Sequence, residues 1–91
     1  MTTRAAPRVQ LLSVPDCPLV VWVRAGVRLA LAQCGIVAAV EECVGAYPSP
    51  TVLVDGRDVI TGEPPTLQAC CRFDLPTVQQ IIAVLCSARS G

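Results

Sequence analysis

The chain has 91 residues, of which 53% are hydrophobic and 15% are charged, and its seven basic and seven acidic side chains cancel. This composition indicates one small globular domain and not a disordered chain. The absence of net positive charge and the low aromatic content (3%) argue against nucleic-acid binding. The chain has no histidine, which excludes Ser-His-Asp and Cys-His catalysis and most catalytic zinc sites.

The N-terminus has no apolar stretch typical of a signal peptide, and residues 1–7 are predicted to be a disordered lead. Residues 19–40 are long and apolar enough to cross a bilayer. However, Arg24 and Arg28 near its centre would each cost about 2.5–3.5 kcal/mol there. We therefore expect one domain over residues 8–88 with no membrane span, monomeric and cytoplasmic, where thiols stay reduced.

The first elements are a short buried strand and a helix. The apolar run over residues 8–14 predicts the strand. Asp16 or Cys17 is expected to cap the following helix, with Pro18 in its first turn, where proline is tolerated. The helix is expected to end before Gly35, which is a typical C-terminal signal. Its predicted buried stripe consists of Val20, Val23, Val27, Ala30, Leu31 and Cys34.

A second strand is predicted over residues 36–40, whereas residues 41–45 fit either a continued strand or a helical turn. The run Thr51-Val52-Leu53-Val54 predicts a third strand, and the dipeptide Asp55-Gly56 is a strong hairpin signal. The return strand is then expected over residues 57–61.

A Pro-rich loop over residues 62–76 follows the hairpin. The closing helix is expected to begin near Pro76 and Thr77, with Asp74 near its N-cap. The predicted order is therefore β-α-β, a short connector, and β-β-α.

Three segments resemble known thiol proteins. Asp16-Cys17-Pro18-Leu19-Val20 resembles the Cys-Pro-x-Cys motif of glutaredoxins, with valine in the last place. Ser49-Pro50-Thr51-Val52-Leu53-Val54-Asp55-Gly56 resembles the segment that carries the cis-proline of thioredoxin-like proteins. Ala69-Cys70-Cys71-Arg72-Phe73 completes a pattern similar to small thioredoxin-like proteins often labelled alkylmercury lyase.

The resemblance implies an α/β, thioredoxin-like (glutaredoxin-like) fold of the minimal βαβ-ββα type. It implies a four-stranded mixed sheet in which the second thioredoxin helix is short or absent. It also implies a cis peptide bond before Pro50, and a substrate site formed by Pro18, Ser49, Pro50 and Thr51.

Cys17 is the candidate catalytic residue, because free N–H groups at a helix N-terminus favour a thiolate. Asp16 opposes this effect with a neighbouring negative charge. No basic residue flanks Cys17 closely in sequence, and the approach of Arg57 or Arg72 in three dimensions stays open. Valine at position 20 cannot resolve a mixed disulfide, so Cys17 has no local partner for dithiol chemistry.

The other cysteines and the single tryptophan leave alternatives open. Cys70 or Cys71 resolves Cys17 from a distance, binds a soft metal (Hg, Zn or Cu) together with Cys17, or packs inward as a small hydrophobe. Core packing is the prediction for Trp22 and for the remaining cysteines. These are Cys34, Cys43 and Cys86.

Three functions are compatible with these residues. The first is monothiol redox chemistry at Cys17, with glutathione, another small thiol or a protein thiol as partner and with no required cofactor. The second is soft-metal or organomercury binding of the alkylmercury lyase-like kind through Cys17 with Cys70 and Cys71. The third is a non-catalytic binding module. Whether the chain is an enzyme, such as a thiol-disulfide oxidoreductase, stays open because it lacks both a Cys-x-x-Cys motif and histidine.

Overall fold

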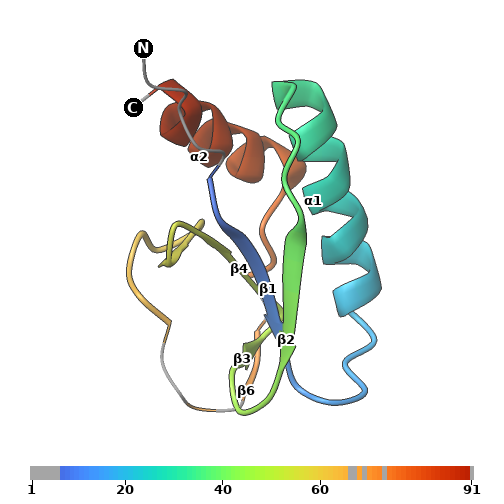
Figure 1. The fold of residues 1–91 in the computed structure, drawn as a ribbon. Helices are drawn as coiled ribbons and strands as arrows, with labels where there is room; N and C mark the ends of the chain where they lie inside the picture. The colour runs from blue at the N-terminus through green and yellow to red at the C-terminus, as the bar shows by residue number, and fades with distance from the viewer. Residues whose placement is uncertain (1–6, 66–67, 69, 73, 91) are drawn as a thin grey trace.

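The computed structural model describes residues 7–65, 68, 70–72 and 74–90, with the backbone alone for Cys71, Arg89 and Ser90. The predicted N-terminal lead therefore lies, apart from Pro7, outside the described residues. The elements follow one another as labelled in Figure 1: β1 (Val9–Ser13), α1 (Val20–Cys34), β2 (Val40–Val44), β3 (Pro48–Ser49), β4 (Thr51–Val54), β5 (Arg57–Asp58), β6 (Cys70–Cys71) and α2 (Val78–Ser90).

The strands form a four-stranded sheet in the order β2-β1-β4-β5 and a separate pair, β3-β6. β1 runs parallel to β2 and antiparallel to β4, and β4 continues into β5 as an antiparallel hairpin. This arrangement confirms the predicted mixed α/β class with a four-stranded mixed sheet. The short parallel pair β3-β6 was not predicted, because two-residue strands carry no periodic signal.

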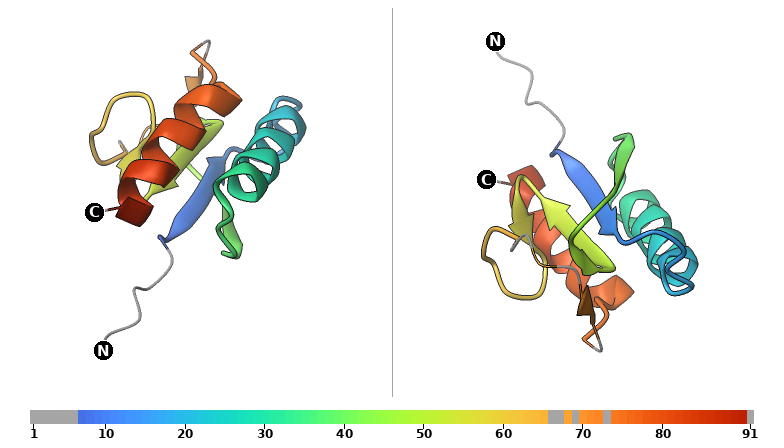
Figure 2. Two further views of the ribbon diagram at one scale, coloured as in Figure 1. Left: turned by 90° about the horizontal axis from the view of Figure 1, so that it is seen from above. Right: turned by 90° about the horizontal axis from the view of Figure 1, so that it is seen from below.

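Both helices cover the same face of the sheet. Figure 2 shows the helices in front of the strands from above and behind them from below. Side chains alternate between the two faces of a strand, so the residues of β1 and β4 that face the helices follow a period of two. The register pairs Val9 with Val54 and Leu11 with Val52, and all four are buried.

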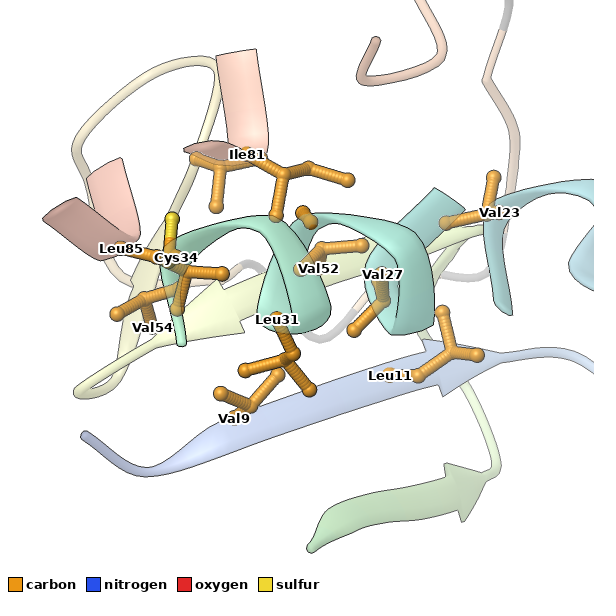
Figure 3. Packing of buried hydrophobic residues seen from close by; sticks show 12 residues of the cluster. Val9, Leu11, Val23, Val27, Leu31, Cys34, Val52, Val54, Ile81 and Leu85 are labelled. Atoms are coloured by element: carbon orange, nitrogen blue, oxygen red, sulfur yellow. The ribbon is translucent and has the colours of Figure 1, made fainter. Parts of the chain in front are cut away.

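The core fills the space between this face and the two helices (Figure 3). Val27 and Leu31 of α1 lie over β1 and β4, and α2 contributes Ile81 and Leu85. The predicted buried stripe of α1 is confirmed for every member except Val20, which is half-buried.

The start of α1 differs from the prediction. The helix begins at Val20 with Leu19 as its N-cap residue and no side-chain cap, so Cys17 and Pro18 lie in the preceding turn. Val20 N–H donates to the carbonyl of Cys17 at 3.4 Å, which closes a single tight turn ahead of the helix. The predicted end is confirmed, because Gly35 adopts the left-handed conformation (φ 66°) of a C-terminal cap.

The second strand is also displaced from its predicted place. β2 comprises residues 40–44, so it shares only its first residue with the predicted run 36–40 and confirms the continued strand, one of the two alternatives left open for the residues that follow. Glu41 and Glu42 point to opposite faces of this edge strand, and each meets an arginine. Arg8 Nε contacts Glu41 Oε2 at 2.8 Å, and Arg24 Nη2 of α1 contacts Glu42 Oε1 at 2.6 Å. Charged side chains are common on edge strands, so a search for apolar runs alone does not locate this strand.

The hairpin is confirmed, but its return strand is short. Asp55 and Gly56 both have positive φ (53° and 82°), as a two-residue hairpin turn requires. β5 ends at Asp58, whose Oδ1 accepts the N–H of Ile60 at 2.8 Å. This local bond turns the backbone away from the ladder, so the strand predicted over residues 57–61 stops after two residues.

The closing helix has a reciprocal cap. Thr77 Oγ1 accepts the N–H of Gln80 at 3.1 Å, and Gln80 Oε1 accepts the N–H of Thr77 at 2.8 Å. The expectation that Asp74 lies near the N-cap is wrong, since its carboxylate binds Arg72 instead.

Between β2 and β3 the described backbone bends without forming a helix. Neither helix in the described part of the chain is long and apolar enough to cross a membrane.

Ile81 joins α2 to the core and is fully buried, so the Ile81→Ala variant should lose about 3 kcal/mol of unfolding free energy. Val37 is 96% exposed, and Val37→Ala should change stability by less than about 0.5 kcal/mol. Urea denaturation of both variants checks this; equal effects would contradict the described core.

Candidate functional site

Cys17, the predicted catalytic residue, lies half-buried in the turn that connects β1 to α1. Asp16, directly before it, has a φ of 60°, in the left-handed region that residues other than glycine rarely adopt, although aspartate is more tolerant than most. Pro18 follows Cys17 and is exposed. The turn therefore presents Cys17 ahead of the helix and not within its first turn.

The predicted substrate segment lies at the same end of the sheet. Leu12 of β1 pairs with Thr51 of β4, so continuing this antiparallel register by one residue places Pro50 opposite Ser13. Ser13 is the last residue of β1, and the chain then leads into the Cys17 turn. The Ser49–Pro50 peptide bond is cis, as expected.

All three residues of this segment are nevertheless buried. Ser49 is 1% exposed, and its hydroxyl makes no hydrogen bond among the described residues. Thr51 Oγ1 donates to the carbonyl of Pro48 at 2.6 Å. The side chains of Ser49 and Thr51 are therefore almost closed to solvent, and the neighbouring Pro48 is half-buried.

Arg72 holds this edge together. Its Nη1 donates to Asp58 Oδ2 at 2.6 Å and to Thr51 Oγ1 at 3.1 Å. Its Nε and Nη2 donate to the two carboxylate oxygens of Asp74 at 3.1 and 2.8 Å. Its backbone N–H donates to the carbonyl of Ser49 at 3.0 Å. The described partners of the Arg72 guanidinium are thus Asp58, Thr51 and Asp74, and Arg57 Nη1 donates to the carbonyl of Gly62.

The ion pairs shift the titration of their members. The hydrogen bonds that Arg72 donates to Asp74, and then the one it donates to Asp58, raise the pKa of Arg72 above its ordinary value despite partial desolvation. The same contacts with Arg72 lower the pKa of Asp74. The Arg72 and Asp58 side chains are each 9% exposed, so this pair is shielded from water, whereas Asp74 is exposed.

A cavity of about 560 Å³ lies beside this ion-pair cluster. Its walls include Pro48 and Thr51 on one side, Asp58 and Arg72, and the exposed Cys70 of β6. β6 reaches this position because it pairs in parallel with β3, placing Pro48 opposite Cys70 and Ser49 opposite Cys71. The structure thus brings Cys70 next to Pro48, whereas Cys17 is not among the residues that line the cavity.

The predicted soft-metal set of Cys17, Cys70 and Cys71 is not assembled in what the structure describes. Within the described ranges, no three Cys, Asp or Glu side chains are grouped closely enough to hold a metal ion. The side chain of Cys71 lies outside the described part, so its share in such a site stays a prediction.

Sequence reasoning missed several features of this region. The ion-pair cluster of Arg72 joins residues that are far apart in sequence, and no local pattern signals it. Trp22 was expected to pack in the core but is 75% exposed, because it lies on the face of α1 opposite the buried stripe. Cys86 was also expected to pack inward and is exposed.

Replacing Arg72 with methionine should cost about 3 kcal/mol, because the Asp58 carboxylate would remain in a poorly hydrated place without its cation. Arg8→Met removes an ion pair in which the arginine side chain is 63% exposed and should cost less than about 1 kcal/mol. Urea denaturation measures both. Asp58→Asn is then added to the Arg72→Met variant. If the double variant recovers none of the lost stability, the unpaired Asp58 carboxylate is not the cause of the loss.

Acid should destabilise the fold. The pKa values of Glu41, Glu42 and Asp74 are lowered by their arginine partners, so the folded state binds protons less readily than the unfolded state. The stabilisation is present above the unfolded-state pKa values and is lost as the pH falls below about 4. The urea midpoint should therefore decline between pH 5 and pH 3, and an unchanged midpoint would contradict these ion pairs.

Comparisons of the chain with models of known protein families, with curated proteins and with solved structures find no match. Two cysteines supply reactive groups at this end of the sheet. One is half-buried in the β1–α1 turn, and the other lies on the wall of the cavity beside Pro48.

Proposed function

We propose that this chain is a thioredoxin-like thiol protein in which Cys17 forms mixed disulfides with a small thiol, such as glutathione, or with a protein thiol. The observation that carries the proposal is the position of Cys17 in the turn that follows β1, one of the two inner strands of the sheet. The turn after β1 and the Ser49–Thr51 segment before and within β4 lie at the same end of the sheet. One end of the sheet thus holds both parts of the predicted site.

The sheet order supports the thioredoxin-like part of the proposal. The order β2-β1-β4-β5 joins a β-α-β unit to a β-hairpin, and a final helix packs beside α1. This order supports the minimal βαβ-ββα arrangement that the motif resemblance implies, with the short strands β3 and β6 in addition. Fold alone does not assign a reaction, so the reaction has to be argued from Cys17.

The chemistry available to Cys17 is a single exchange. Its thiolate attacks one sulfur of a disulfide R–S–S–R, forming the Cys17–S–R bond while the second sulfur leaves as a thiolate and takes up a proton. Val20 stands where a resolving cysteine would be in the glutaredoxin motif, and it opens α1. A second external thiol must therefore attack the Cys17–S–R bond to release R and restore Cys17.

The surface beside Cys17 favours a partner with an apolar portion. Val21 and Trp22, in the first turn of α1, are 59% and 75% exposed, and Pro18 is exposed as well. Exposed aromatic side chains are common anchors at protein interfaces. A protein thiol is therefore a suitable partner alongside a small one.

The test is the rate at which each cysteine of the reduced protein is alkylated by iodoacetamide at pH 7, read by peptide mass spectrometry. Cys17 should react on the order of tenfold faster than Cys43, which is also half-buried but lies on a strand. With oxidised glutathione, the mixed disulfide should form at Cys17 and be absent in the Cys17→Ser variant.

The Cys43→Ser variant is the matched control and should behave as the wild type. If Cys17 reacts no faster than Cys43, the redox proposal is wrong. Tight Hg(II) uptake that is lost in both Cys17→Ser and Cys70→Ser, but not in Cys43→Ser, would instead favour the soft-metal function.

A further inference from the structure

Two cysteines far from Cys17 are in direct contact across the helix pair. The sulfur of Cys34, the last residue of α1, lies 2.9 Å from the sulfur of Cys86 in α2, although 52 positions separate them in sequence. Figure 3 shows the Cys34 sulfur on the side of α1 that faces α2. Among the cysteine side chains that the structure describes, this is the one pair of sulfurs in contact.

The packing of the two helices defines the position of both sulfurs. Cys34 Sγ also contacts the carbonyl oxygen of Ile82 at 3.7 Å, one turn before Cys86 on α2. Cys34 therefore lies against one turn of α2, next to the core residues Leu31 and Leu85. These contacts hold the Cys34 side chain beside Cys86 in the folded protein.

The two residues differ in accessibility. Cys34 is 4% exposed, whereas Cys86 is exposed. A reagent from solution can therefore reach Cys86 but not Cys34. If Cys86 forms a mixed disulfide, the thiol of Cys34 is already within contact distance of its sulfur.

We propose that Cys34 and Cys86 form a reversible disulfide by exchange with low-molecular-weight disulfides. The Cys86 thiolate attacks R–S–S–R, the Cys86–S–R bond forms, and one R–S⁻ leaves and takes up a proton. Cys34 then loses its proton and attacks the Cys86 sulfur, which forms the Cys34–Cys86 bond and releases the second RSH. Two protein thiols are oxidised, and one small disulfide is reduced to two thiols.

The change of structure needed for this bond is small. Bonded sulfurs are about 2.05 Å apart, so the two sulfurs must approach by about 0.9 Å from their present separation. The bond would tie the C-terminal end of α1 to α2. It would close a long loop that contains most of the sheet, and cross-links that close long loops constrain the unfolded chain most.

The experiment treats the folded, reduced full-length protein with oxidised glutathione. Digestion with trypsin and a glutamate-specific protease separates the Cys34 peptide from the Cys43 peptide, because Glu41 and Glu42 lie between them. The linked Cys34–Cys86 peptide should be the first internal disulfide detected. The melting temperature should rise by on the order of 10 °C and return to its starting value with dithiothreitol.

Single variants test each step. Cys34→Ala should trap glutathione on Cys86, and Cys86→Ser, a change at an exposed position, should abolish the linked peptide and the rise in melting temperature. Cys43→Ser is the matched control and should retain both effects. Cys17→Ser should retain them too, which separates this result from the proposed function of Cys17.

Three results would overturn the proposal. One is the absence of the linked peptide while the protein remains folded. Another is a melting temperature that rises equally in Cys86→Ser. The third is loss of the cross-link in Cys17→Ser, because exchange would then start at Cys17 and not at Cys86.

Discussion

The hydrogen bonds of the Arg72 guanidinium hold together the edge of the sheet that contains the Ser49–Thr51 segment. Arg72 connects β5 through Asp58, β4 through Thr51 and the start of the last loop through Asp74. Its own backbone pairs with Ser49, so the segment around β6 is held against the proline edge of the sheet. A buried charge is costly unless its donors are satisfied, and here every terminal nitrogen of Arg72 has an acceptor. All four members of this cluster line the cavity that Pro48 and Cys70 also line.

The molecule separates its thiols into two regions with different chemistry. Cys17 and Cys70 lie toward the end of the sheet where β1 finishes and β4 begins, and both are accessible to some degree. Cys34 and Cys86 lie between the helices, where one sulfur is enclosed by the core and the other reaches the surface. The first region suits exchange with an external thiol, and the second suits an internal bond. The two regions also differ in what surrounds the sulfurs, since a turn presents Cys17 whereas packed helices hold Cys34.

Local pattern was sufficient where one residue type has a specific conformational role. Gly35 ended α1 because glycine adopts the left-handed cap without strain, and Asp55-Gly56 produced the predicted hairpin. Local pattern failed where a tertiary contact changed the meaning of a residue. The sequence left open whether Glu41 and Glu42 continue the strand or form a helical turn, because the arginines that pair with them come from elsewhere in the chain. Aspartate is a residue type that often caps helices, yet the carboxylate of Asp74 forms an ion pair with Arg72.

The sequence alone predicted the α/β class, the buried stripe of α1, the hairpin and the position of Cys17 after the first strand. These depend on hydrophobic period and on turn residues, which act over a few positions. Only the tertiary structure decided which distant side chains meet. It brought Cys34 to Cys86, committed Arg72 to Asp58 and left Trp22 exposed. Such pairings depend on how the helices pack on the sheet. The paired residues are distant in sequence, so no local pattern predicts them.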